Sequence, residues 1–527
     1  MKKKRALLIN VVNFNLLWKV EILFIYSGLS GIQYRYVVTL FGFFTYFELD
    51  CFRTATSMSI VKMVNSTAVN FKKSLNDTID SCPLYNMVME EIFLESDAEG
   101  EYNWSPEIQG YVLSAGFLGY VISQLPGGLA AETYGAKRVY LSGVLLASLA
   151  HLLSPLAAWH SCYTLIVIQL LRGLGQGFQS PANSVVTANW FPKHERGFLN
   201  SLIFLGSGVG SFITYTTSGA MCSSSTLLGG WPSVYFIYGG LGLVLSLCIH
   251  LFLYDSPKEH PNIGRVELLY ILENQENDLF QKKPPTPWNK ILTSIPVYVM
   301  TFSVFSHFWA FTHQISEHPI FLANILHFPI ETNGILNAIP FVFQTLMIFL
   351  GGWVSKWLNT HGYAGVDKVR KGCTMLYSLG YSAGLLGMYI AGCDRIWSNA
   401  FSFIAFSFVG LSYAGCLSVP SDMSPTYAGS LFAFSNTIAS TAAFIFPLII
   451  GMMIYVEESL EQWNKIFILC ITVVMSSGIL FCLFGSADVV PWNFPSIEVW
   501  DRNRPKDEAL KSGSKECTLS KGASIHI

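Results

Sequence analysis

Three charged residues lie close together in a stretch of the chain that is otherwise uncharged. Glu48, Asp50 and Arg53 are the charged residues between positions 36 and 61. Asp50 and Arg53 are three residues apart, so both lie on one face of a helix. The guanidinium of Arg53 offers a planar set of donors that matches a carboxylate or a phosphate. Two interpretations stay open: an internal ion pair that only neutralises charge, or a site for an anion.

A second set of polar residues follows one face of an expected helix. Its members are 3, 4, 3 and 4 residues apart: Gln169, Arg172, Gln176, Gln179 and Asn183. Lipid cannot be the neighbour of such a stripe, which either lines a water-filled path or hydrogen-bonds to other helices. A shorter stripe contains Ser303, His307, Gln314 and Glu317. His307 is either a core histidine or a ligand contact.

These polar residues interrupt a chain that is mostly apolar. Asp, Glu, Lys and Arg make up 13% of its 527 residues, about half of the roughly 25% found in soluble proteins. A membrane-spanning helix needs about 20 apolar residues to cross about 30 Å of hydrocarbon. Stretches without these four residue types run over 108–131, 139–171, 173–192, 197–254, 291–316, 332–355, 372–393, 396–421, 423–456 and 466–487.

These stretches predict an all-α polytopic membrane protein with twelve transmembrane helices in two six-helix halves. The longest stretch breaks at Cys222 to Pro232 into two helices, and residues 36–61 add another. The strands of a membrane β-barrel would be half as long and would alternate polar with apolar residues. The expected regions are a cytosolic lead (1–35), a first half (36–254), a central cytosolic loop (255–290), a second half (291–487) and a cytosolic tail (488–527).

An internal repeat supports the division into halves. Gln109-Gly110 through Gly127-Gly128 overlays Asn333-Gly334 through Gly351-Gly352 at a constant offset of 224 residues, and three glycines match. Two similar halves around a central cavity are typical of secondary transporters.

The distribution of basic residues predicts that both termini are cytosolic. With this orientation, eight Lys and Arg residues of short loops lie inside and five lie outside, as the positive-inside rule requires. The loop 64–106 is then extracytosolic, and it carries all three glycosylation sequons, at Asn65, Asn76 and Asn103. The first 30 residues resemble the start of a signal peptide, but Lys19 and Glu21 interrupt the apolar stretch, so an uncleaved lead is expected.

Several classes of function are excluded. The basic residues are scattered over short segments, which disfavours nucleic-acid binding. The sequence contains no HExxH, GxSxG or P-loop pattern, so we expect neither an enzyme nor a bound metal or cofactor, apart from a coupling ion, Na⁺ or H⁺. The glycines at 173–177 and 206–210 indicate close helix packing. The eleven cysteines are interpreted as small core residues, although Cys82 falls in the expected outer loop and its disulfide state is left open.

A short loop between the second and third expected spans combines glycines with opposite charges. Its residues are Gly128, Glu132, Gly135, Lys137 and Arg138. An acid beside two cations can form a latch that one conformation makes and another breaks; the alternative is a basic loop that only sets topology. The pattern resembles the loop signature of the major facilitator superfamily, with a degenerate copy at 351–356 and 368–371.

Beyond this loop, the chain resembles solute carrier family 17, which includes type I sodium/phosphate cotransporters, sialin and the vesicular glutamate transporters. The resemblance covers about residues 35 to 495. It rests on Arg53 and on the segments 59–65, 104–110, 119–128, 190–196, 254–261, 306–309, 333–336, 422–429 and 435–437. It implies a twelve-helix carrier of organic anions or phosphate, with Arg53 at the substrate-binding arginine and His307 where some members have a second basic substrate residue.

Departures from the family pattern narrow the substrate. Where sialin has two glutamates in its fourth helix, this chain has Arg172 and Gln176, which disfavours sialin-type proton symport. Where the glutamate transporters have a histidine and an arginine, it has Leu113 and Gln169, which disfavours vesicular glutamate transport. The sodium/phosphate and broad organic-anion branch fits best.

The sequence therefore predicts a secondary carrier with a cationic site between its halves. The expected substrate-binding residues are Arg53, Arg172, His307, Gln176, Gln169 and Asn436, and the coupling candidates are Glu48 and Asp50. Its partners would be a small anion and the lipid bilayer, and the carrier would act as a monomer, in the plasma membrane rather than in a vesicle or lysosome. The alternatives are an anion-binding sensor that does not transport, or a sialin-like proton-coupled carrier of acidic sugars.

Overall fold

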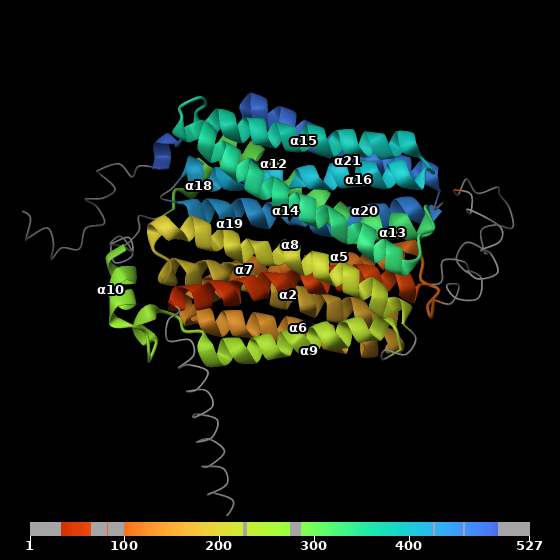
Figure 1. Cartoon of the computed structure of the whole chain (residues 1–527), viewed down its shortest axis with the longest axis horizontal. Helices are drawn as coiled ribbons and strands as arrows, with labels where there is room; N and C mark the ends of the chain where they lie inside the picture. The colour runs from red at the N-terminus through yellow and green to blue at the C-terminus, as the bar shows by residue number, and fades with distance from the viewer. Residues whose placement is uncertain are drawn as a thin grey trace, which may run out of the picture.

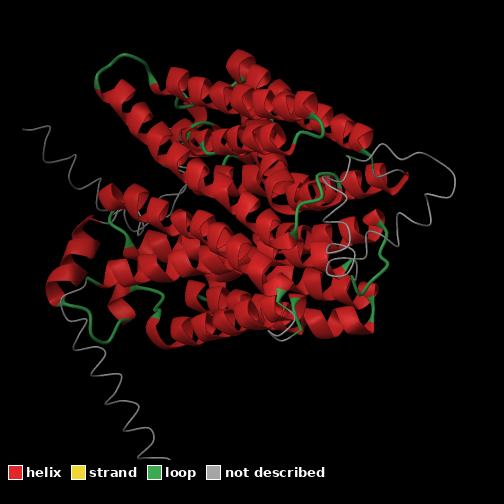
Figure 2. Cartoon of the chain, turned by 45° about the vertical axis from the view of Figure 1, so that its right-hand side comes forward, coloured by secondary structure: helices red, strands yellow, loops and turns green. Residues whose placement is uncertain are grey.

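The computed structural model describes residues 33–64, 82, 100–224, 229–274, 286–424, 427–456 and 459–493. These residues form helices joined by short loops (Figure 2). Their one β-type pairing is an isolated bridge between Val64 and Tyr102. The predicted all-helical fold is confirmed.

In the described residues of the first part of the chain, six long helices are present. They are α2 (Tyr34–Met63), α5 (Pro106–Tyr134), α6 (Ala136–His160), α7 (Cys162–Trp190), α8 (Lys193–Ser223) and α9 (Trp231–Phe252). The turn η1 (Pro257–Glu259) and the helix α10 (Arg265–Asn274) follow. The predicted break at 222–232 lies between α8 and α9, where Gly229 and Gly230 adopt positive φ angles of 81° and 84° that favour glycine.

The second part contains more interrupted helices. The short α11 (Trp288–Ile291) precedes a long segment made of α12 (Ile295–Thr312), the π-helical turn η3 (His313–Glu317) and α13 (His318–Asn324). Two continuous helices follow, α14 (Ile330–Thr360) and α15 (Val366–Ala391). The next segment is divided into α16 (Arg395–Val409), α17 (Leu411–Ala414), η4 (Cys416–Ser418) and α18 (Val419–Met423). The chain continues with α19 (Ala428–Ala439), α20 (Thr441–Val456), α21 (Leu460–Phe484) and η5 (Pro491–Asn493).

Among the described residues, eight helical segments are long and apolar enough to cross a membrane by length and composition. The helices α2, α7, α8 and α15 do not meet this criterion. Two of these carry the polar groups that the sequence singles out: α2 holds Glu48, Asp50 and Arg53, and α7 holds the polar stripe. α2 and α7 tolerate these polar side chains because the side chains are buried against other helices rather than exposed to lipid.

The helices α2 to α9 form one set and the helices α12 to α21 form another, and the two sets lie side by side (Figure 1). Helices α2, α6, α7 and α9 occupy the lower part of the view, and α12, α15, α16 and α21 the upper part. Contact between the sets is made mainly by two helix pairs, α5 with α20 and α8 with α14.

Glycines allow backbone contact at both of these helix crossings. A Cβ atom on Gly110 of α5 would lie 2.7 Å from the carbonyl oxygen of Pro447 in α20. A Cβ on Gly334 of α14 would lie 2.5 Å from the carbonyl oxygen of Tyr215 in α8. We call the four glycines at the two crossings the glycine seam: Gly110, Gly219, Gly334 and Gly451. Gly110 and Gly334 are a matched pair of the internal repeat, so the repeat has a physical reason in this contact.

A disulfide joins the two sets of helices at the same end as the glycine seam. Cys82, between α2 and α5, is bonded to Cys393, between α15 and α16. The interpretation of the cysteines as small core residues is therefore wrong for this pair, because its sulfurs come from two loops 311 residues apart. The same corner contains His327, whose pKa is lowered by burial and by the Arg395 guanidinium.

The segment after α9 fixes the beginning of α2. The carboxylate of Glu267 in α10 accepts hydrogen bonds from the backbone nitrogens of Tyr34 at 2.9 Å and Arg35 at 3.1 Å. It thereby satisfies two of the donors that the first turn of a helix leaves free. The ring of His260 packs 3.9 Å from that of Tyr34, and burial lowers the pKa of His260 to about 4.

Replacement of Gly334 by leucine tests the seam. The new side chain has no space against the Tyr215 carbonyl, so α14 and α8 must separate, and we expect Gly334→Leu to lower the free energy of unfolding by about 1–3 kcal/mol. The matched control is Gly352→Leu in the same helix, where a Cβ has no heavy atom within 4 Å. Thermal unfolding in detergent compares the two, and equal melting temperatures would contradict backbone contact at this crossing.

The disulfide is tested by peptide mapping without reductant. We expect one cross-linked species that contains Cys82 and Cys393 and that separates after reduction, whereas peptides with the unbonded Cys162 stay unchanged. Cys393→Ser should leave a reactive thiol at Cys82 and lower stability by about 2–5 kcal/mol. Recovery of both peptides as free thiols from the native protein would refute the bridge.

Candidate functional site

Arg53 is held inside the protein by an acid and two aromatic rings. Its side chain is buried, and its Nη1 lies 3.3 Å from Oδ1 of Asp50. Its guanidinium carbon lies 4.8 Å from the ring centre of Tyr120 and 5.3 Å from that of Phe117, both in α5. Oδ2 of Asp50 accepts a hydrogen bond from Ser207 of α8. The ion pair that the sequence allowed is therefore present, and it lies where α2, α5 and α8 meet.

Arg172 is a second buried cation, and it lacks a matching partner. It is 2% exposed, and neither its Nε nor its Nη1 has a hydrogen-bond partner. Its guanidinium lies against Gly116 of α5, where any larger residue would displace it. Arg172 interacts electrostatically with Arg53, which repels it, and with Glu48. An unpaired cation buried in this way is costly, so the site favours an added anion.

Glu48 interacts directly with neutral donors. Its Oε2 accepts a hydrogen bond from Nε2 of Gln179 at 3.2 Å, and its Oε1 accepts one from Oγ of Ser148 at 3.4 Å. It has no ion pair within 4 Å among the described residues, although Arg172 is within electrostatic range. The two acids of α2 thus have different environments: Asp50 neutralises Arg53, and Glu48 does not form a direct pair.

The amides of the polar stripe mostly bind other helices of the first half. Nε2 of Gln169 donates to Oγ of Ser154 in α6 at 3.2 Å. Nε2 of Gln176 donates to the carbonyl oxygen of Leu49 in α2 at 2.9 Å. Of the two interpretations of the stripe, a water-filled path or hydrogen bonds to other helices, these two glutamines fit the second in this conformation. Arg172 lies between them without such a bond.

His307 lies in the second half, beside a tyrosine that interacts with Asp50 of α2. Its Nδ1 is 2.8 Å from Oγ of Ser412, and its ring centre is 5.3 Å from that of Tyr413. Tyr413 in turn interacts electrostatically with Asp50. Sequence analysis missed Tyr413 and Tyr120, because a tyrosine in an apolar helix carries no pattern that separates a site residue from a core residue.

Asn436 forms a contact between the two sets of helices. Its Nδ2 donates to Oε1 of Gln124 in α5 at 3.2 Å, and Oγ1 of Thr437 donates to the same oxygen at 3.2 Å. No described contact joins Asn436 to Arg53, Arg172 or His307. Asn436 therefore bridges α19 and α5 in this conformation.

A large cavity lies elsewhere in the described residues. It has a volume of about 1250 Å³ and lies between α2, α9 and α10. Its walls include Leu40, Phe44 and Leu241, which are exposed on the outer surface of the helices. Glu48 borders it, whereas Arg53, Arg172 and His307 do not. This cavity is an apolar groove on the side of the first half. It is separate from Arg53 and Arg172, which we call the arginine pair.

The loop between α5 and α6 finds an acidic partner after α9. Gly135 has a φ angle of 95° and separates the helices. The backbone nitrogen of Lys137 donates to Oδ1 of Asp255 at 2.6 Å, and its Nζ lies 4.7 Å from the ring centre of Tyr254. Arg138 is exposed and Gly128 lies within α5, while the side chain of Glu132 lies outside the described part of the chain. Asp255 is thus an acidic contact of this loop that sequence analysis did not identify, and the latch itself stays a prediction.

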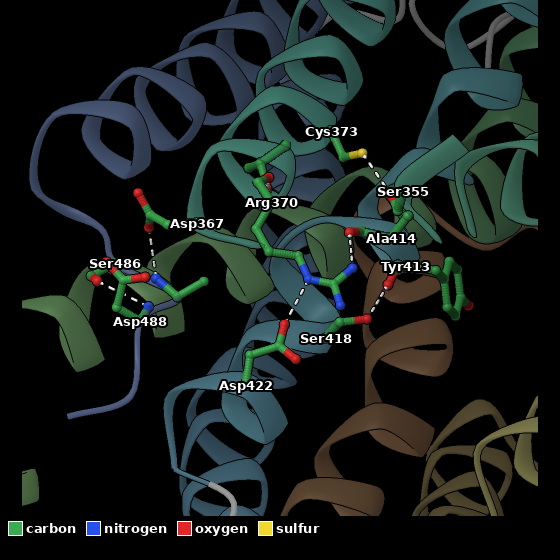
Figure 3. Close-up of polar contacts among 12 residues, drawn as sticks. Ser355, Asp367, Arg370, Cys373, Tyr413, Ala414, Ser418, Asp422, Ser486 and Asp488 are labelled. Atoms are coloured by element: carbon green, nitrogen blue, oxygen red, sulfur yellow. Dashed lines mark hydrogen bonds and ion pairs between the residues drawn. The ribbon is translucent and has the colours of Figure 1, made fainter. Parts of the chain in front are cut away.

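The second half contains a similar polar cluster (Figure 3). Nε of Arg370 pairs with Oδ2 of Asp422 at 2.6 Å, and its Nη1 donates to the carbonyl oxygen of Ala414 at 2.7 Å. Oδ1 of Asp367 accepts a hydrogen bond from the nitrogen of Ala487 at 2.8 Å. An aspartate therefore links the beginning of α6 to the segment after α9, and another links the beginning of α15 to the segment after α21.

The glycosylation sites are only partly described. Asn103 is exposed just before α5. Asn65 and Asn76 lie outside the described residues. Among the residues that the structure describes, no group of three His, Cys, Asp or Glu side chains could hold a metal ion.

Comparison with known proteins identifies related sequences along most of the chain. Residues 23–447 match the family model of the Major Facilitator Superfamily. A putative inorganic phosphate cotransporter of Drosophila ananassae is 29% identical and covers 90% of this chain and 96% of its own length. Human sialin is 28% identical, covering 87% of this chain and 90% of its own. Human vesicular glutamate transporter 2 is 28% identical, covering 88% of this chain and 76% of its own.

Solved structures share the fold. A D-xylose–proton symporter matches with a TM-score of 0.64 at 15% identity, covering 86% of this chain and 99% of its own. A bacterial homologue of the human lysosomal transporter Spinster matches with a TM-score of 0.60 at 14% identity, covering 85% of this chain and 96% of its own.

A double-mutant cycle tests the Arg370–Asp422 pair. Because these side chains are only 16% and 26% exposed, we expect Arg370→Ala and Asp422→Asn each to lower stability by about 1–3 kcal/mol, with a coupling free energy of about 1 kcal/mol. The comparison pair is Glu461–Lys465, which is 74% and 50% exposed and should show a coupling of about 0.3–0.5 kcal/mol. Thermal unfolding gives both values, and additive effects of the two substitutions would argue against the pair.

Proposed function

The chain belongs to the major facilitator superfamily and is related to the anion transporters of solute carrier family 17, and on this premise we propose that it carries small organic anions or inorganic phosphate. It is an integral multi-pass membrane protein and a secondary transporter rather than an enzyme, as its family membership shows. The anion, the driving ion and the site residues are our proposal.

The observation that carries the proposal is the unpaired Arg172 beside Arg53. Arg53 shares its charge with Asp50, but two nitrogens of Arg172 have no partner, and the two guanidinium groups repel each other. A carboxylate or phosphate bound between α2 and α7 would accept hydrogen bonds from Arg172 and relieve the repulsion. Gly116 leaves space for this guanidinium on the α5 side.

The second half contributes His307 through Tyr413. Tyr413 contacts the ring of His307 and interacts electrostatically with Asp50, so an anion at the arginine pair would be bordered by groups from both halves. Rocking of the halves would then expose the site to each side of the membrane in turn. Gln176 and Gln169 would support α7 around Arg172, and Asn436 would hold α19 against Gln124.

The membrane potential and a coupling ion would supply the drive. Moving one charge through 100 mV is worth about 2.3 kcal/mol. Of the two coupling candidates in α2, Glu48 suits protonation better than Asp50, because Asp50 already pairs with Arg53 and Glu48 has only neutral hydrogen-bond donors. Sodium remains the other candidate ion.

We further propose that both termini are cytosolic and that the loop 64–106 is extracytosolic. The disulfide between Cys82 and Cys393 supports this orientation, since such bonds persist in oxidising compartments. The exposed Asn103 would then lie on the side where glycosylation occurs. The two sets of helices would be the two halves of a monomeric carrier in the plasma membrane.

Flux measurements in proteoliposomes test the site. Phosphate, urate, sialate and glutamate are presented in turn, with the sodium gradient, proton gradient and membrane potential set independently. We expect flux of at least one anion, and a loss of about tenfold or more in Arg53→Ala and in Arg172→Ala, because each removes a charge-assisted contact worth about 1.5–3 kcal/mol.

The matched control is Arg265→Ala, which removes an exposed arginine at the beginning of α10 and should leave flux unchanged. Wild-type flux in a correctly folded Arg53→Ala or Arg172→Ala protein would refute the site. Saturable anion binding without flux of any anion would support the sensor alternative instead. Flux of an acidic sugar that follows the proton gradient alone would support the sialin-like alternative.

A further inference from the structure

Glu317 is a buried acid without a partner inside the helical segment that runs from Ile295 to Asn324. It ends the π-helical turn η3, between α12 and α13. It is 3% exposed, and its Oε1 has no hydrogen-bond partner. No ion pair to it exists among the described residues, in contrast to Asp50. Single π-helical turns occur frequently at functional sites.

The carboxylate lies at the contact between the two halves. Together with Gln109 of α5, Glu317 borders a cavity of about 10 Å³. Gly110 and Gly451 of the glycine seam belong to the same walls, as does Pro447. The cover over Glu317 is therefore made by α5 from the first half and α20 from the second. Separation of these two helices would open the cavity to the extracytosolic side.

The neighbouring titratable groups do not neutralise Glu317. On its own segment, His313 is bonded to the hydroxyl of Tyr381 at 2.8 Å, and His318 to Oδ1 of Asn337 at 2.7 Å. On α21, Cys470 is within electrostatic range, and its sulfur accepts a hydrogen bond from Trp309 at 3.3 Å.

The other helices around η3 contribute no charge in the described contacts. Ser57 of α2 donates to the carbonyl oxygen of Ser316 at 3.2 Å, and Tyr215 of α8 donates to that of Ile315 at 2.6 Å. The residues that α20 contributes to the cavity are Pro447, Ile450, Gly451 and Ile454, all without polar side chains. On the α5 side, the walls are Pro106, Gln109, Gly110 and Leu113.

Burial therefore favours the neutral acid while the seam is closed. An unpaired charged carboxylate in a dry interior costs several kcal/mol. When α5 and α20 separate, water can reach Glu317, and this cost disappears. The two conformations of the seam thus differ in their affinity for a proton at this carboxylate, and linkage makes proton binding favour closure.

We propose that Glu317 is a proton-binding site that couples the extracytosolic pH to closure of the glycine seam. A proton from the outer solution converts the carboxylate into the neutral acid before α5 and α20 meet over it. A metal cation fits less well, because such an ion needs several oxygen ligands and the cavity has space for about one water molecule. This inference rests on the alternating access of the proposed function, but it concerns a different site from the arginine pair.

Hydrogen–deuterium exchange of the whole protein tests the proposal without any substrate. Exchange times are scaled for the intrinsic effect of pH, and peptides from 106–113 and 447–454 are followed at pH 5.5 and 7.5. In the wild type we expect several-fold slower exchange of both peptides at the lower pH. In Glu317→Gln, which stays neutral, slow exchange should persist at both pH values.

Two variants keep the test specific. Glu317→Asp retains a titratable group and should retain the pH dependence. Glu331→Gln removes an exposed carboxylate at the other crossing, where it accepts a hydrogen bond from Ser223, and should behave like the wild type. The same pH dependence in Glu317→Gln as in the wild type, or no pH dependence in the wild type, would overturn the proposal.

Anion flux distinguishes this proposal from the proposed function. If the anion site is correct, lowering the external pH should raise wild-type uptake several-fold and should change uptake little in Glu317→Gln. A protein that transports no anion but still shows the pH-dependent exchange would refute the carrier function and retain the proton site. Anion transport with identical pH profiles in the wild type and in Glu317→Gln would retain the carrier function and refute the proton site.

Discussion

Backbone contact between the two halves is the constraint on which the rest of the structure depends. Lipid is as apolar as leucine, so helices in a membrane associate through close packing and hydrogen bonds rather than through the hydrophobic effect. At the glycine seam, α5 meets α20 and α14 meets α8 with no side chain between them. This contact brings Tyr413 within range of Asp50, places Gln124 beside Asn436, and covers Glu317.

Many of the helices were predictable from the sequence, because each is a local feature. The break after Cys222 follows from a polar, glycine-containing segment, and α8 ends at Ser223 for that reason. The matched glycines Gly110 and Gly334 were visible as a repeat, although their role was not. The ion pair of Asp50 with Arg53 was also predictable, because three residues along a helix fix which side chains meet.

Contacts between distant segments could not be read from the sequence. Whether Gln176 lines a path or bonds to Leu49 depends on the rotation of α7 against α2. The partner of Cys82 is 311 residues away. Glu317 looks like the end of a polar stripe in the sequence, but its isolation results from apolar walls that α5 and α20 supply. Each of these contacts depends on how distant helices pack against one another, and a local sequence pattern does not determine that packing.

The unpaired groups of Arg172 and Glu317 have opposite charge when ionised and lie in different halves. The anion site and the proton site therefore depend on the same physical cost, that of burying an unpaired charge. Arg172 keeps two nitrogens without partners in the first half, and Glu317 keeps an oxygen without a partner in the second. An anion satisfies the first and a proton satisfies the second. A carrier that closes with only one of them bound buries one unpaired charge, at a cost of several kcal/mol, whereas a carrier with both bound buries none. Coupling between anion and proton would then need no contact between their sites, because the cost of closing the seam depends on both.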